Sequence, residues 1–63
     1  MRLNLKTIRQ EMHLTQEELA DMSGVGRVTI SRLETGKLKE TTAGTLSKLA
    51  RALNVTIDKL VEK

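Results

Sequence analysis

The 63-residue chain contains no cysteine, no proline and no aromatic residue. Without cysteine, neither a disulfide nor a thiolate zinc site can stabilise a domain this close to the lower size limit for an unaided hydrophobic core. The core must therefore be aliphatic. The absence of proline leaves helices uninterrupted, and the absence of aromatic rings removes the stacking platforms typical of RNA-binding modules.

Long apolar segments are also lacking, since no more than two apolar residues are adjacent anywhere in the sequence. This excludes a transmembrane span and a signal-peptide core within the chain. We therefore expect a cytoplasmic protein without membrane contact. The net charge of +3 favours a polyanionic partner if the charges gather on one face, although charge alone does not identify DNA.

Apolar residues recur at helical spacing in five segments, and no segment alternates with the period of a strand. The first helix is predicted from about residue 2 to residue 12, with Leu5, Ile8 and Met12 on one face. No linker or repeat divides the chain. We expect an all-α fold, a compact bundle of five short helices in one domain over residues 1–63.

Residues 16–35 combine two short helices with a glycine turn, which is the arrangement of a helix-turn-helix. Thr15 and Glu18 match a capping box, in which each side chain bonds the backbone amide of the other residue. The second helix is therefore predicted to begin at Gln16, and Gly24 ends it in a left-handed conformation. Its inward residues are Leu19 and Ala20, and the position of Met22 is left open.

The third helix is predicted over about residues 27–35, with Gly36 as its stop. Ile30 and Leu33 face inward. The outward face, suited to a DNA major groove, carries Arg27, Val28, Ser31 and Arg32.

These outward residue types fit base readout, because an arginine can grip guanine O6 and N7 and a valine can pack on a thymine methyl group. On an exposed helix, Arg27 and Arg32 can equally be plain solvated charge. Thr29 lies between the two faces, where it touches a phosphate or packs. Within the helix-turn-helix pattern we expect Arg27, Val28, Ser31 and Arg32 to contact bases.

Two further helices follow a polar loop at residues 38–42. Thr42 is the expected N-cap of a fourth helix over about residues 43–53, which Asn54 ends. Thr56 caps a last short helix. The fourth helix is predicted to bury Leu46, Leu49, Ala50 and Leu53. The apolar face of the last helix is formed by Ile57, Leu60 and Val61.

The segments LTQEELADMSGVGRVTISRLETGK and TLSKLARALNV resemble the phage lambda and 434 repressor/Cro family, also called the XRE family. The resemblance covers roughly residues 5–61. It implies a five-helix DNA-binding domain that works as a symmetric dimer on a near-palindromic operator, with half-sites about one helical turn apart. It also implies that the third helix is the recognition helix.

The resemblance implies further roles by position. Gln16 would anchor a phosphate or make the first base contact, which the free amides of a helix N-terminus also favour. Lys37 and Lys39 would lie along the phosphates, where lysine adds affinity but little sequence information. Arg9 and Glu34 would form a structural ion pair that joins the first helix to the end of the third.

Two positions depart from the family pattern. Glu40 would oppose a nearby phosphate, so the contact of this loop stays open beyond Lys39, with Thr41 or Thr42 as neutral alternatives. Gly26 stands where many relatives have serine or threonine as the N-cap of the third helix. Glycine is a tolerable cap at that position.

The sequence does not favour an enzyme, a metal or cofactor site, or a small-molecule ligand. His13 is the only histidine and has no cysteine partner, and the carboxylates of residues 17–21 suit the positive end of a helix.

We therefore expect a prokaryotic or phage-encoded, sequence-specific regulator of transcription that binds double-stranded DNA, most simply a repressor. A weak, DNA-assisted homodimer would form through residues 38–42 and the last helix, where Leu60 and Val61 would be partly exposed. Alternatively, the chain is the DNA-binding part of a longer protein. A function of another class stays open: an antitoxin or anti-repressor that uses this scaffold to bind a protein.

Overall fold

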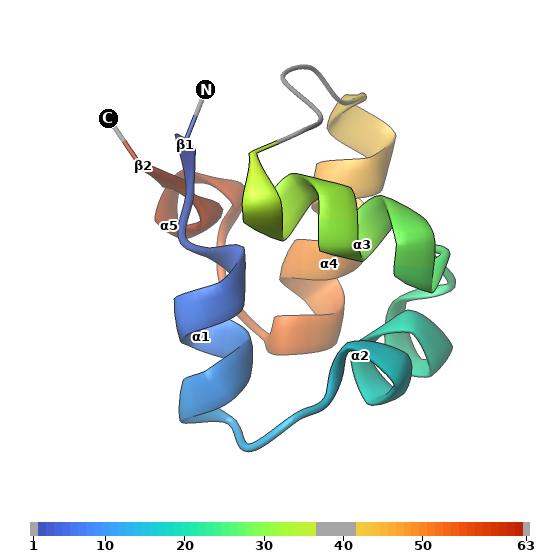
Figure 1. The fold of residues 1–63 in the computed structure, drawn as a ribbon. Coiled ribbons are helices and arrows are strands. Elements are labelled where there is room, and N and C mark those ends of the chain that lie inside the picture. Colours follow the sequence, from blue (N-terminus) through green and yellow to red (C-terminus); the bar gives the residue numbers. More distant parts are fainter. Residues whose placement is uncertain (1, 37–41, 63) are drawn as a thin grey trace.

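The computed structural model describes residues 2–36 and 42–62, whose arrangement is shown in Figure 1. The five predicted helices are present, and the all-α fold class is confirmed. A two-residue strand precedes the first helix and another follows the last. In chain order the elements are β1 (Arg2–Leu3), α1 (Leu5–Glu11), α2 (Gln16–Ser23), α3 (Arg27–Thr35), α4 (Ala43–Leu53), α5 (Ile57–Leu60) and β2 (Val61–Glu62).

Helix α1 is shorter than the prediction of residues 2–12. It begins at Leu5, because the backbone before it pairs with β2 as a strand. Met12, predicted to share one face with Leu5 and Ile8, follows the last residue of the helix and is 40% exposed, so it does not join them in the core. Arg9 lies instead on the buried face, beside Leu5 and Ile8. The inward face of α1 therefore contains a charge that must be compensated.

The end of α1 is closed by a left-handed residue that is not glycine. His13 has φ +59°, and its backbone N–H donates to the carbonyl of Gln10 at 3.0 Å. The N–H of Leu14 donates to the carbonyl of Arg9 at 3.1 Å. These two bonds satisfy carbonyls that a helix end leaves without partners.

Helix α2 has the predicted boundaries and the predicted capping box. The Glu18 amide donates to Thr15 Oγ1 at 3.0 Å, and the Thr15 amide donates to Glu18 Oε1 at 2.9 Å. Gly24 follows the helix with φ +76°. Of the residues considered for the inward face, Leu19 is buried, whereas Met22 is 53% exposed and does not join the core.

Helices α3 and α4 also match their predictions. Gly26 precedes α3 as an N-cap without a side-chain bond, and Gly36 ends it with φ +78°. Thr42 caps α4, since its Oγ1 accepts from the Thr45 amide at 3.1 Å. Asn54 ends α4 in the left-handed region, with φ +57°.

The core is aliphatic and draws on every helix. Helix α4 packs against both α2 and α5, and α3 packs against α1 and α2 (Figure 1). Burying these side chains is the main stabilising contribution in a chain without disulfides. The large side chains that are less than 2% exposed are Leu5, Leu19, Ile30, Leu49, Leu53 and Leu60.

The two ends of the chain lie side by side, which the sequence did not predict (Figure 1). Strands β1 and β2 are antiparallel, with Leu3 opposite Val61. Next to them, the Asn4 amide donates to the Leu60 carbonyl at 2.8 Å. Leu60 is only 1% exposed, so the expectation that it stays partly free for a dimer is wrong. Val61 is half-buried.

Within residues 2–36 and 42–62, no helix combines the length and the apolar character needed to cross a bilayer.

Candidate nucleic-acid interface

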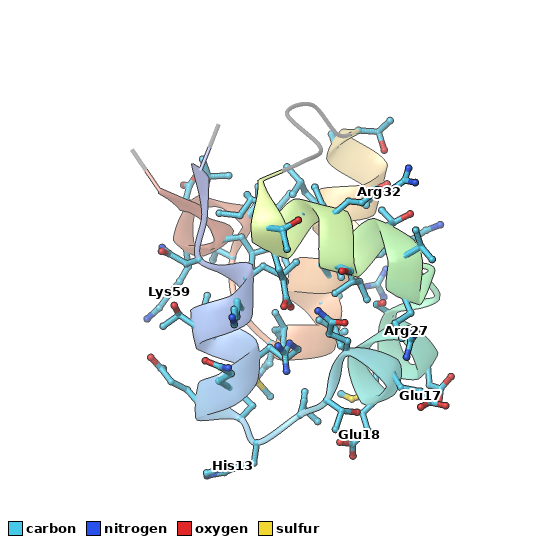
Figure 2. All side chains as sticks on the ribbon, viewed as in Figure 1. His13, Glu17, Glu18, Arg27, Arg32 and Lys59 are labelled. Atoms are coloured by element: carbon cyan, nitrogen blue, oxygen red, sulfur yellow. The ribbon has the colours of Figure 1, made fainter. Side chains whose placement is uncertain are left out.

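Helix α3 has two distinct faces. Ile30 and Leu33 point into the core, with 0% and 5% of their surface exposed. On the opposite face, Arg27 and Arg32 are exposed and Val28 is 61% exposed. Figure 2 shows both arginines on α3, with Arg27 at its beginning and Arg32 further along. The outward face of α3 thus combines two cations with one exposed apolar side chain.

The outer face of α3 and the beginning of α2 enclose one shallow hollow of about 270 Å³. Four of the residues that line it were predicted to contact bases, and a fifth, Gln16, was predicted to contact the DNA backbone. The sixth, Thr35, was not predicted. Its spacing of four residues from Ser31 was a signal that could have found it. The lining residues are Gln16, Arg27, Val28, Ser31, Arg32 and Thr35.

The structure does not place the other three predicted backbone contacts at the hollow. Thr29 is half-buried and does not line the hollow. Lys37 and Lys39 lie outside the residues that the structure describes, as do Glu40 and Thr41. Thr42, one of the neutral alternatives, is committed to capping α4.

A buried ion pair lies next to Gln16, one of the residues that line the hollow. Arg9 Nε donates to Glu34 Oε2 at 2.7 Å, and Arg9 Nη2 donates to Glu34 Oε1 at 3.0 Å. The two side chains are only 11% and 2% exposed. Arg9 Nη1 also donates to the Leu14 carbonyl at 2.6 Å. The expected pair is thus present, and it joins α1, the segment before α2, and α3.

A third side chain joins this pair, which the sequence did not indicate. Gln16 Nε2 donates to Glu34 Oε1 at 3.0 Å. Gln16 is the first residue of α2 and also lines the hollow. The buried carboxylate is therefore linked directly to the predicted DNA-binding surface.

The hydrogen bonds to Glu34 raise the pKa of the Arg9 guanidinium, more than burial lowers it, and the negative charge of Glu34 raises it further. Because the folded-state pKa is raised, the stability that Arg9 contributes would be lost only as the pH rises through that elevated value. Arg9 is therefore a cation at every pH at which such a protein works.

At the N-terminus of α2, some backbone amides are paired by the capping box and others are not. The capping box occupies the amides of Thr15 and Glu18. The amides of Gln16 and Glu17 have no acceptor among the described residues. Figure 2 shows Glu17 and Glu18 projecting from this first turn. Free amides and the positive end of the helix favour an anion at this position, next to the hollow.

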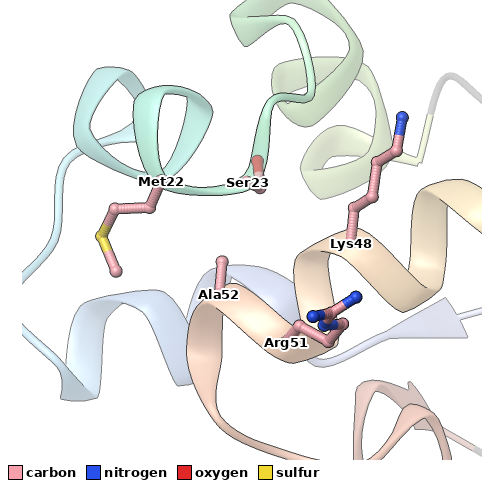
Figure 3. A pocket seen from close by; sticks show the side chains of 5 residues that line it. All are labelled: Met22, Ser23, Lys48, Arg51 and Ala52. Carbon is pink, nitrogen blue, oxygen red and sulfur yellow. The ribbon is translucent and has the colours of Figure 1, made fainter.

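A second hollow, of about 340 Å³, lies away from α3, where the end of α2 faces the later turns of α4 (Figure 3). Met22 and Ala52 give it an apolar part, and Lys48 and Arg51 add two cations. In the described part of the chain, neither cation has a carboxylate within ion-pair distance. This hollow shares no residue with the first one.

Among the described residues, no group of three or more histidine, cysteine or carboxylate side chains is arranged to hold a metal. His13 is exposed and lies at the loop after α1 (Figure 2).

The model of the helix-turn-helix family HTH_3 matches residues 5–60, which is most of the chain. The chain belongs to this helix-turn-helix family. The match includes α1 to α5, and with them the hollow and the buried ion pair. This is a family of DNA-binding transcription regulator domains and not of enzymes.

Relatives with curated names agree with this assignment. The HTH-type transcriptional repressor RghR of Bacillus subtilis (strain 168) is 41% identical over 59 residues, which are 94% of this chain and 44% of RghR. The control protein C.SmaI of Serratia marcescens is 38% identical over 60 residues, which are 95% of this chain and 70% of C.SmaI. This helix-turn-helix chain thus spans less than half of RghR and about two thirds of C.SmaI.

Among solved structures, the N-terminal DNA-binding domain of SinR from Bacillus subtilis superposes with a TM-score of 0.88 at 25% sequence identity. The superposition covers 95% of this chain and 87% of the SinR domain. The fold is therefore shared over almost the whole of both chains.

Proposed function

We propose that this protein is a sequence-specific repressor of transcription that binds a palindromic operator as a homodimer, with α3 in the major groove. The observation that carries the proposal is the hollow between α2 and α3. It gathers Gln16 and the outward side chains of α3 on one accessible surface. None of the lining residues is a core residue, and Gln16 is bonded to the buried Glu34.

The outer face of α3 supplies the proposed base contacts. Arg27 and Arg32 each bind guanine O6 and N7, Val28 packs on a thymine methyl group, and Ser31 donates to or accepts from a base edge. A well-formed bidentate contact discriminates against the wrong base by about 1–3 kcal/mol. Because the inward face is anchored by Ile30 and Leu33, these side chains keep a defined orientation.

The proposed backbone contacts surround this face. The free amides at the start of α2, together with the Gln16 side chain, bind one phosphate. Thr29 is proposed to touch another phosphate. Lys37 and Lys39 follow α3 in the sequence and are proposed to add affinity along the strand without reading bases.

The repressor assignment draws on RghR, which is named a transcriptional repressor. A symmetric dimer on half-sites about one helical turn apart is the usual way in which a helix-turn-helix of this size gains affinity. Leu60 is not available for that dimer because it is buried. On α5 the exposed large apolar side chain is Ile57, which is 38% exposed.

The experiment is a selection of bound duplexes from a random DNA pool, followed by titration of the selected duplex and a scrambled one at several salt concentrations. We expect a palindromic consensus, a clear preference over the scrambled duplex, and a steep fall of affinity with salt, since each neutralised phosphate releases counterions. Equal affinity for both duplexes at every salt concentration would refute the proposal. It would instead favour a protein-binding regulator on the same scaffold.

A further inference from the structure

The Glu34 carboxylate accepts three hydrogen bonds from two side chains. Oε2 receives the Arg9 Nε bond, and Oε1 receives bonds from Arg9 Nη2 and Gln16 Nε2, both at 3.0 Å. With 2% of its side chain exposed, Glu34 is out of reach of DNA. Gln16 is half-buried and lines the hollow, so it connects the buried pair to the surface.

The chemistry of this bond determines which way the Gln16 carboxamide faces. An ionised carboxylate only accepts hydrogen bonds, so the nitrogen of the amide, and not its oxygen, must face Glu34. The carboxylate is paired with the Arg9 cation, which donates two hydrogen bonds to it. One Nε2 hydrogen is thereby used. The second Nε2 hydrogen has no acceptor among the described residues.

We propose that Glu34 is a positioning residue for DNA binding: it holds the Gln16 carboxamide in one orientation before DNA arrives, with the second Nε2 hydrogen free to donate to a phosphate. This inference rests on the proposed function. A flipped amide would present its oxygen to the phosphate, and two acceptors repel each other. Fixing the amide in advance removes both the wrong orientation and part of the ordering cost of binding.

The first test needs no DNA. The chain has two glutamines, Gln10 and Gln16, and Gln10 is exposed on α1 with no side-chain hydrogen bond in the described structure. In nuclear magnetic resonance spectra we expect the Gln16 side-chain amide to be more rigid, and slower to exchange its hydrogens with water, than that of Gln10. Glu34→Gln should abolish the difference, because the new carboxamide can present either oxygen or nitrogen to Gln16. Equal mobility of both glutamines in the wild-type protein would overturn the proposal.

The second test is a double-mutant cycle on operator binding, with Gln16→Ala, Glu34→Gln and the combination of both. Gln16→Ala should weaken operator binding about tenfold in the wild-type background and less than about threefold beside Glu34→Gln. Glu11→Gln is the matched control for Glu34→Gln, since Glu11 is an exposed carboxylate on α1. In that control background the full effect of Gln16→Ala should persist.

Glu34→Gln leaves Arg9 without its ion partner, so thermal unfolding first establishes that the variant is folded. If it is not, Arg9→Met combined with Glu34→Leu takes its place, because replacing both members of a buried pair by apolar residues of similar size preserves stability. Gln16→Ala should then have the same small effect in this background.

The outcomes separate the two proposals. If the wild-type protein prefers its operator but the losses from Gln16→Ala and Glu34→Gln are independent, the positioning role is refuted and the proposed function stands. If Gln16 is rigid but the wild-type protein does not distinguish the operator from a scrambled duplex, the proposed function fails, and the role of Glu34 in DNA binding fails with it.

Discussion

Arg9 is the residue on which the contact between α1 and α3 most depends. It makes two bonds to Glu34 and one to the Leu14 carbonyl while only 11% of its side chain is exposed. Arg9→Ala leaves a buried carboxylate uncompensated, and removing one member of such a pair costs about 3–5 kcal/mol. We expect a loss at the lower end of that range in the free energy of unfolding, measured by urea denaturation.

Lys6→Ala is the control for Arg9→Ala, since Lys6 is an exposed cation on the same helix. Its effect should stay within about 0.5 kcal/mol. A similar loss in both variants would mean that the Arg9 ion pair contributes no more to the free energy of unfolding than an exposed lysine does.

At the DNA-binding surface, Arg27 and Lys37 are proposed to act differently. Arg27→Ala should relax the base preference at one position in each half-site, because a bidentate base contact is removed. Lys37→Ala should weaken binding to all sequences about equally and lower the salt dependence. Binding to a panel of operators with single base changes distinguishes these results. A loss from Arg27→Ala that is the same for every operator would contradict its role in base readout.

At the scale of elements, the turn between α2 and α3 contains two glycines with opposite requirements. Gly24 has φ +76°, whereas Gly26 has φ −60° and caps α3 without a side-chain bond. A Cβ added at either position meets nothing within 4 Å, so only the backbone conformation distinguishes them.

Gly24→Ala should therefore destabilise the protein by about 1 kcal/mol, because an L-residue is strained in the left-handed region. Gly26→Ser should stabilise it by about 0.5–1 kcal/mol, since serine restricts the unfolded chain and adds a capping hydroxyl. Thermal unfolding of the two variants is the measurement. The same sign of change in both would show that conformation at these positions does not control the stability of the turn.

For the whole molecule, α5 contributes to the core although it has only four residues. Leu60 is 1% exposed, so Leu60→Ala should cost about 2–5 kcal/mol, a large fraction of the stability of so small a domain. Ile57→Ala, on the exposed side of the same helix, should cost less than about 1 kcal/mol. Urea denaturation compares them. A small effect of Leu60→Ala would show that α5 and the paired termini do not fold with the rest of the domain.

The prediction of the elements succeeded where local chemistry specifies a boundary. Each of these boundaries depends on a residue that bonds backbone groups only a few positions away, so the sequence reveals it. The examples are the capping box at Thr15, the hydroxyl cap at Thr42 and the left-handed Gly24. The prediction failed at the start of α1, because residues 2–3 pair with residues 61–62, and no local pattern reveals a partner so distant in the sequence. His13 in the left-handed region was missed for a different reason, since glycine is the usual signal for that conformation.

The candidate DNA-binding surface, too, was predicted from the sequence only in part. The sequence by itself determined the five helices, the aliphatic core and the outward face of α3, because helical periodicity separates Ile30 and Leu33 from Arg27 and Arg32. Only the tertiary structure decided that Gln16 bonds Glu34 and that Leu60 is buried. These contacts join residues that are distant in sequence or belong to different elements, and their geometry is set by how the helices pack, which periodicity within one helix does not encode.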